Sequence, residues 1–268
     1  MSSTAQRPWL KLVMVVGGSA FLGLSILPFV DSFLPKSTTP TPTPQSEQVS
    51  EAKGFELVLQ KDPDNVYALR SLLEIRLRQQ DLQGALPLLT RLAKNNPTIG
   101  EYHILLAQTQ VELGNQEAAV TTYREFLQRQ PDNLLALVGI TDLLMQLQRP
   151  ALAESIVQQS LVKVKPGQAD MAGMQIQMAR LYLAQGKIAP ALALLEQLIQ
   201  QNPQDFRPVF AKAQTLTALG KPQEAQPLFA KAAELAPPEH RDEIKRLTAV
   251  ATQPSPSPSP GNPSPKSP

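Results

Sequence analysis

Apolar residues are distributed along this chain in two ways, as one uncharged run near the start and then at helical spacing further on. The run, Leu12–Val30, reads LVMVVGGSAFLGLSILPFV and carries no charge from end to end. At about 1.5 Å per residue, such a helix nearly spans a bilayer core of about 30 Å. Trp9 lies at the depth expected of an interfacial aromatic residue. The pattern predicts a short tail at 1–8 and a transmembrane helix over 9–30.

The basic residues around this run predict its orientation. Lysine and arginine concentrate on the cytoplasmic side of membrane helices, and Arg7 and Lys11 precede the run while Lys36 follows it. We therefore expect a single-pass protein of an inner, plasma or thylakoid membrane. Its N-terminus would be cytoplasmic and the rest periplasmic or lumenal. A cleaved signal peptide is the alternative, although the run exceeds the usual length of such a segment and no Ala-x-Ala site follows it.

Beyond the run, apolar segments end at prolines that recur at a nearly constant period. A fixed period of roughly 20–50 residues is typical of solenoids, in which each repeat is one supersecondary unit. The spacing here lies well within that range and varies little from one proline to the next. The prolines are Pro63, Pro97, Pro131, Pro166, Pro203 and Pro237.

Three residue types stand at fixed distances before these prolines. A glycine lies about half a period before three of these prolines. An alanine lies about a third of a period before four of them, and an aromatic residue lies about a quarter of a period before three. Glycine ends a helix where the backbone turns left-handed, alanine lets a second helix approach closely, and the aromatic residue one turn later fills the gap. Helix–turn–helix units are therefore predicted. The residues are Gly114, Gly186 and Gly220; Ala85, Ala119, Ala191 and Ala225; and Phe55, Tyr123 and Phe229.

The repeat units follow one another with two departures from the pattern. Residues 46–62 are predicted to be a lone second helix, which is half a repeat, and 239–251 a polar-faced cap helix. Gln80 and Gln148 replace the glycine in their units, and a one-residue slip places Ala153 out of register. The full units are predicted at about 66–99, 100–133, 134–168, 172–205 and 206–239.

Proline-rich segments flank this repeat region. The segment 31–45 contains PKSTTPTPTPQ, which favours an extended polyproline II spacer. The segment 252–268 is rich in Pro and Ser and lacks the apolar residues of a core, so a disordered tail is expected.

The repeated pattern resembles the tetratricopeptide repeat (TPR) family, whose pattern is W-x2-L-G-x2-Y…A-x3-F…P. The resemblance covers about 46–251. It implies an all-α solenoid of about five helix–turn–helix repeats with a half repeat and a C-terminal cap helix, behind the transmembrane helix over 9–30. In the unit 100–133 the matching residues are Leu106, Ala107, Gly114, Ala119, Tyr123 and Pro131.

In this family the first helices line a concave groove that binds extended peptides or a partner's helix. The resemblance therefore implies a partner-binding groove at the second, fifth, ninth and twelfth residues of each unit. The lysine/asparagine clamp that holds chaperone tails in some members is absent, so such capture is not expected. The groove residues we expect to contact a partner are Tyr67, Arg70, Glu74, Gln108, Asp142, Arg180, Phe210 and Gln214.

Composition and charge give no indication of a catalytic, metal-binding or nucleic-acid-binding site. The chain has no cysteine and two histidines, and its net charge of +2 comes from the two ends rather than from the repeats. It contains no P-loop, no H-E-x-x-H, no G-x-S-x-G and no dinucleotide fingerprint. We therefore expect no enzyme activity, catalytic residues, metal, cofactor, small-molecule substrate or nucleic acid.

These observations together predict a membrane-tethered scaffold for protein–protein interaction. Its partner would be a peptide or helix segment of a membrane complex subunit, and self-association is possible. The glutamine-rich, cysteine-free repeats and Ser-Pro tail resemble those of photosynthetic bacteria, where such proteins assist photosystem assembly or repair. We thus expect an assembly, repair or maturation factor. The alternatives are a structural component of an envelope or secretion apparatus, and a secreted periplasmic binding module formed by signal cleavage.

Overall fold

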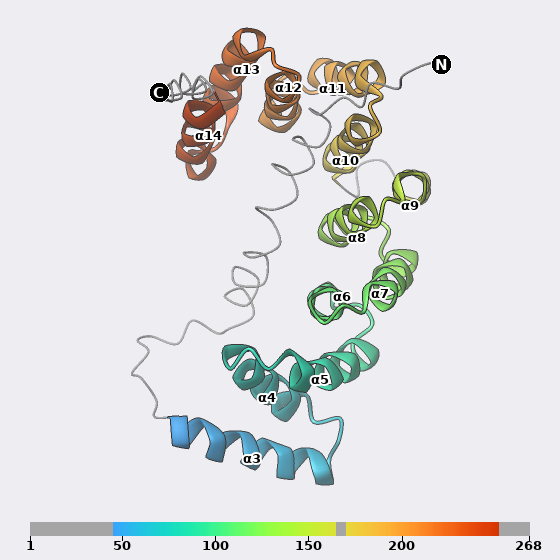
Figure 1. The fold of residues 1–268 in the computed structure, drawn as a ribbon, viewed down its shortest axis with the longest axis vertical. Coiled ribbons are helices and arrows are strands. Elements are labelled where there is room, and N and C mark those ends of the chain that lie inside the picture. Colours follow the sequence, from blue (N-terminus) through green and yellow to red (C-terminus); the bar gives the residue numbers. More distant parts are fainter. Residues whose placement is uncertain (1–44, 165–169, 252–268) are drawn as a thin grey trace, which may run out of the picture. The chain divides into compact units, whose positions relative to one another are not determined.

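The computed structural model describes residues 45–164 and 170–251, and within these ranges the chain forms α-helices and no strand (Figure 1). The predicted all-α architecture of repeated helical hairpins is confirmed. The helices are α3 (Gln45–Lys61), α4 (Val66–Arg78), α5 (Leu82–Asn95), α6 (Gly100–Glu112), α7 (Gln116–Arg129), α8 (Leu134–Gln146), α9 (Pro150–Lys163), α10 (Met171–Ala184), α11 (Ile188–Gln201), α12 (Phe206–Ala218), α13 (Pro222–Leu235) and α14 (Pro238–Ala251).

The predicted membrane segment lies outside the described residues. Among the helices from α3 to α14, none has the length and apolar character needed to cross a bilayer. The transmembrane helix over 9–30, the linker over 31–45 up to the start of α3, and the tail over 252–268 therefore stay predictions.

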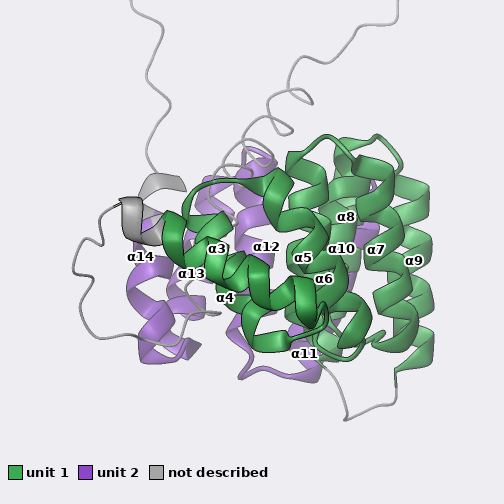
Figure 2. Ribbon diagram, turned by 90° about the horizontal axis from the view of Figure 1, so that it is seen from below, with its two compact units in different colours: residues 1–186 green, residues 187–268 purple. Residues whose placement is uncertain are grey.

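The chain divides into two compact units, residues 1–186 and 187–268 (Figure 2). In the first unit α4–α5, α6–α7 and α8–α9 pack as hairpins, α3 packs on α4, and α10 packs on α8 and α9. Figure 1 shows α4, α6 and α8 on one side of this unit and α5, α7 and α9 on the other. In the second unit α12 packs on α11 and α13, and α13 packs on α14.

In α4–α5, α6–α7, α8–α9 and α12–α13, which pack within a unit, the second helix carries an alanine at a fixed place, and α11 has one there too. The fourth residue of every second helix is alanine, and each of these side chains is fully buried. Ala153 is one of them, so the prediction that it lies out of register is wrong. The extra length of that unit lies between the end of α9 at Lys163 and the start of α10 at Met171, and hence it leaves the packing of the hairpin unchanged. The five residues are Ala85, Ala119, Ala153, Ala191 and Ala225.

The turn between the helices of each hairpin uses one left-handed residue. Gly114, Gly186 and Gly220 have φ of 79°, 74° and 74°, as the spacing predicts. Gln80 and Gln148 stand at the same place with φ of 56° and 57°. The same left-handed conformation therefore recurs in all five of these turns, although a side chain makes it costly at two of them.

Asn and Asp side chains begin the first helices. Asn65 accepts a hydrogen bond from the backbone N–H of Ala68 at 3.0 Å, and Asn133 accepts one from that of Ala136 at 2.9 Å. These contacts satisfy N–H groups that have no partner within the helix.

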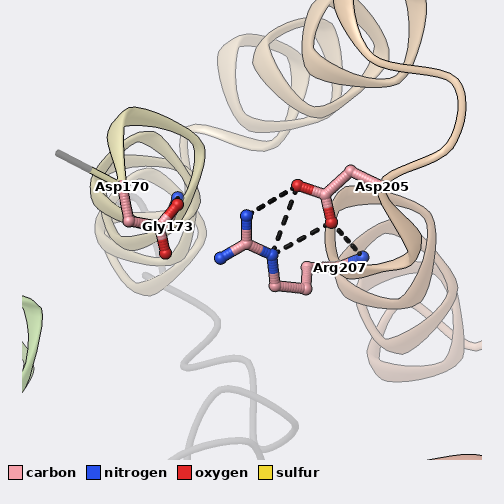
Figure 3. A network of polar contacts seen from close by, with 4 residues as sticks. All are labelled: Asp170, Gly173, Asp205 and Arg207. Carbon is pink, nitrogen blue, oxygen red and sulfur yellow. Dashed lines mark hydrogen bonds and ion pairs between the residues drawn. The ribbon is translucent and has the colours of Figure 1, made fainter. Parts of the chain in front are cut away.

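Asp205 caps α12 and also holds a guanidinium (Figure 3). Its carboxylate accepts the backbone N–H of Arg207 at 3.0 Å and pairs with the side chain of Arg207 at 2.7 Å. Burial alone would raise the pKa of Asp205, but these bonds hold the pKa below its ordinary value. In the first unit, Asp170, also drawn in Figure 3, caps α10 in the same way by accepting from Gly173 N–H at 3.0 Å.

The two strained turns offer a test of this account. Gln80→Gly and Gln148→Gly remove the side chain from a left-handed position, and we expect each to stabilise the protein by about 0.5–1 kcal/mol. Urea unfolding at pH 7 measures the change. Gly114→Ala is the matched control and should lower stability by about 1 kcal/mol, because it places a Cβ at the same kind of position. Glycine variants less stable than the parent would contradict the argument.

Candidate partner-binding face

One residue in each first helix of the first unit occupies an equivalent place. Glu74, Gln108, Asp142 and Arg180 each lie six residues before the left-handed residue that follows their helix. They belong to α4, α6, α8 and α10, and α8 packs against both α6 and α10. We call these four residues the polar row.

Asp142 and Arg180 form the centre of charge in the polar row. Arg180 Nη2 lies 3.9 Å from Asp142 Oδ1, and Arg180 Nη1 donates to Gln177 Oε1 at 3.1 Å. Burial raises the pKa of the Asp142 carboxyl, and the charge of Arg180 only partly opposes the rise. The carboxylate is thus weakly compensated, so a further cation or hydrogen-bond donor would stabilise it.

Tyr123 of α7 lies behind this pair. Its side chain is 2% exposed, and a Cβ at Gly139 of α8 would lie 2.5 Å from its hydroxyl oxygen. Burial, followed by the charge of Asp142, raises the pKa of Tyr123 well above its ordinary value. Glycine at 139 therefore lets the ring pack under α8, on the helix that carries Asp142.

Gln108 has an acceptor that no described residue satisfies. Its Oε1 is buried and has no hydrogen-bond donor among residues 45–164 and 170–251. An unsatisfied buried polar atom costs about 1–3 kcal/mol, and most such atoms in proteins have partners. Because this oxygen has almost no exposed surface, a bound molecule can donate to it only after the half-buried Gln108 side chain turns toward solvent.

The other predicted groove residues differ in their surroundings. Tyr67 is 74% exposed and lies edge-on to Phe55, and Arg70 is exposed on the same helix, α4. Glu74 forms an ion pair with Arg78, one turn later. The structure thus places these three side chains on or near the surface of α4, with Glu74 already engaged by its neighbour.

Phe210 and Gln214 lie on α12, which belongs to the second unit. Phe210 is half-buried, and its ring meets that of Phe229 at 5.6 Å in an edge-to-face arrangement. It therefore contributes to the packing of its own hairpin, whereas Gln214 is exposed.

Sequence reasoning missed two residues that support the polar row. Gln177, 9% exposed, holds the guanidinium of Arg180, and Tyr123 was interpreted as a gap-filling ring without reference to Asp142. The spacing of Gln177, three residues before Arg180 on one helix, was the available signal.

No three His, Asp or Glu side chains gather as metal ligands would in the described ranges. His103 is 7% exposed and stacks on Phe126 with ring centres 4.7 Å apart, and burial lowers the pKa of its imidazole. Its role in the structure is packing between α6 and α7.

Comparisons with known proteins agree with this architecture. Tetratricopeptide repeat models match residues 104–169 and 182–250, which together make up half of the chain. The chain therefore belongs to the tetratricopeptide repeat family. No curated protein matches it in sequence.

Solved structures share the fold at low identity. A tetratricopeptide repeat protein from Parabacteroides merdae is 19% identical, with a TM-score of 0.50, and the match covers 91% of this chain and 93% of that one. Yeast Tom70 is 16% identical with a TM-score of 0.52 over 85% of this chain and 48% of its own. A thermophilic repeat protein of Thermus thermophilus is 24% identical, with a TM-score of 0.47, over 66% of this chain and 94% of its own.

Tetratricopeptide repeats form scaffolds for protein–protein interaction, and the models that match this chain are of that family and not of a catalytic one. Protein or peptide partners are therefore the class of ligand that the fold supports.

The partly buried charge of Asp142, whose side chain is 40% exposed, predicts a small pH-dependent effect on stability. The pKa of Asp142 is raised in the folded chain, so its ionised form is less favourable there than in the unfolded chain. We expect Asp142→Asn to raise the urea midpoint at pH 7. The difference should shrink as pH falls towards the ordinary value of 3.8, where the parent carboxyl is also neutral when folded. Asp132→Asn, in an exposed turn, is the control and should change little. A lower midpoint for Asp142→Asn would mean that attraction to Arg180 dominates.

Proposed function

We propose that this protein is a membrane-tethered scaffold that holds a segment of a partner protein against the polar row. The observation that supports this most directly is the buried Oε1 of Gln108, which has no donor among the described residues. The weakly compensated Asp142–Arg180 pair lies on the two following first helices.

An extended peptide matches the chemistry of this row. Its backbone N–H groups can donate to Asp142 and, once the Gln108 side chain turns outward, to Gln108 Oε1, and its carbonyls can accept from Arg180. Backbone groups are present in every peptide, so contacts with the polar row would supply affinity without sequence preference. Specificity would come from side chains beside the polar row. Leu135, 58% exposed on α8, offers an apolar contact of this selecting kind.

Three of the other predicted residues, Tyr67, Arg70 and Glu74 of α4, extend this surface in the proposal. Phe210 and Gln214 belong to the second unit and stay separate predicted contacts. The large exposed area of Tyr67 supports a role as an aromatic contact, because aromatic side chains dominate the energetics of many interfaces.

Tethering supplies the second part of the proposal. The predicted transmembrane helix over 9–30 and the proline-rich linker over 31–45 would hold the repeats close to the membrane on its periplasmic or lumenal side. Confinement of this kind raises the effective concentration of a partner in the same membrane. The protein would then serve as an assembly, repair or maturation factor for a membrane complex, as its resemblance to photosystem factors of photosynthetic bacteria suggests.

Affinity capture of the detergent-solubilised full-length protein tests the binding face. The variant Gln108→Ala with Arg180→Ala removes an acceptor and a donor from the polar row. We expect it to recover the partner with about 5- to 150-fold weaker affinity, because two hydrogen bonds of about 0.5–1.5 kcal/mol each are lost. Affinity for the captured partner is then measured by titration against each purified variant.

The matched control carries Gln158→Ala with Arg124→Ala, the same residue types at exposed positions of α9 and α7. It should bind like the parent. Equal affinity of all three proteins would show that the polar row is not the binding face. Equal loss in both variants would show that binding depends on overall charge or stability.

A further inference from the structure

The N-terminal half repeat leaves one face of α3 without the helix that such a face meets elsewhere in the unit. Two repeat periods separate α3 from α7, so Gly54 corresponds to Thr122 and Val58 to Phe126. In α7 both residues contact α6: Thr122 donates to Gln110 at 2.8 Å, and Phe126 stacks on His103. The corresponding face of α3 is where the first helix of its own repeat would lie.

No described residue covers that face of α3. Val58 is 41% exposed, whereas Phe126 is fully buried, and a Cβ at Gly54 would meet no atom of residues 45–164 and 170–251 within 4 Å. Glu51 and Lys61, exposed on the same stripe, stand one turn before Gly54 and one turn after Val58. The opposite side of α3 is held by Arg76 of α4, which pairs with Glu56, so this stripe is kept outward.

The segment of the chain that corresponds to the missing first helix is not expected to form a helix. One period before α4 lie residues 32–44, which contain Pro35, Pro40, Pro42 and Pro44. Proline in a helix interior removes a hydrogen bond and costs about 3 kcal/mol. A helix that covers this stripe is therefore expected from another molecule.

The stripe is complementary to itself. When two α3 helices run antiparallel, as the helices of each hairpin do, and cross at Glu56, Val58 of one copy faces Gly54 of the other. The same register sets Glu51 against Lys61, and twofold symmetry makes each of these contacts twice. A valine side chain facing a glycine allows close approach of the two helices, and the opposite charges fix the register. Leu57, 58% exposed, adds apolar area beside this contact.

We infer that α3 pairs with α3 of a second copy of this chain, and that the second copy completes the half repeat. The contact uses the stripe Glu51, Gly54, Val58 and Lys61, which is distinct from the polar row. Dimerisation would therefore present two polar rows from one assembly, and it stands or falls independently of the proposed binding function.

Disulfide formation between copies tests the pairing, since the chain has no cysteine of its own. Full-length Gly54→Cys and Val58→Cys proteins are mixed in detergent and mildly oxidised. We expect the mixed disulfide dimer to form at least about tenfold faster than dimers of Val162→Cys, a control at a 75% exposed valine of α9. No excess over the control would overturn the inference, including the case in which a segment of the same chain covers α3.

Charge reversal tests the register. Sedimentation should show at least about tenfold weaker dimerisation for Glu51→Lys, because each of its two contacts then sets Lys against Lys. The double variant Glu51→Lys with Lys61→Glu restores opposite charges and should recover the parent's affinity. A double variant that dimerises as weakly as Glu51→Lys would contradict the proposed register, and unchanged dimerisation of Glu51→Lys would contradict the contact itself.

Discussion

The close approach of two helices at one buried alanine is the constraint on which each hairpin within a unit depends. The alanine is fully buried in all four of these hairpins, at Ala85, Ala119, Ala153 and Ala225. A larger side chain there would push the helices apart, and overpacking of this kind costs about 1–3 kcal/mol. The turn that precedes the second helix must then reverse the chain within a few residues, which requires the left-handed residue found at Gly114 and its equivalents. Packing thus dictates the backbone conformation, even at Gln80 and Gln148 where the side chain opposes it.

The repeat architecture could be predicted from the sequence because period, alanine and proline report the same geometry independently. Where two of these signals disagreed, as at Ala153, the interpretation followed the proline, and the structure follows the alanine. The reason is physical: proline only marks where a helix ends, whereas the alanine is at the contact. The environment of the polar row could not be predicted in this way. The unsatisfied oxygen of Gln108 and the partial burial of Asp142 depend on neighbouring helices that no local pattern encodes.

The side chains of the polar row lower the stability of the free chain, as residues of a binding face can do. An isolated scaffold gains nothing from an unsatisfied amide oxygen or from a partly buried carboxylate with a partner 3.9 Å away. The amide oxygen and the carboxylate become favourable only when a bound molecule supplies hydrogen-bond donors. Their free-energy cost in the unbound chain is therefore consistent with a ligand-binding face. The supporting residues have the opposite character, because Gln177 and Tyr123 are buried and hold the helices of the row in place.

The two ends of the repeat region solve the same problem differently. A solenoid must shield the hydrophobic face of its last repeat, and α14 does so by burying Ile244 against Val209 and Ala232 while its charged residues face outward. At the other end α3 buries Ala52 but leaves Val58 and Leu57 exposed. Exposed apolar residues on a terminal helix favour association, and proteins usually prevent this with polar caps. The C-terminal end has a polar cap of this kind, whereas the N-terminal end leaves apolar residues of α3 exposed. This difference is consistent with the proposed pairing of α3 helices. The predicted anchor precedes this helix by only the linker, so two copies in one membrane would bring these faces together.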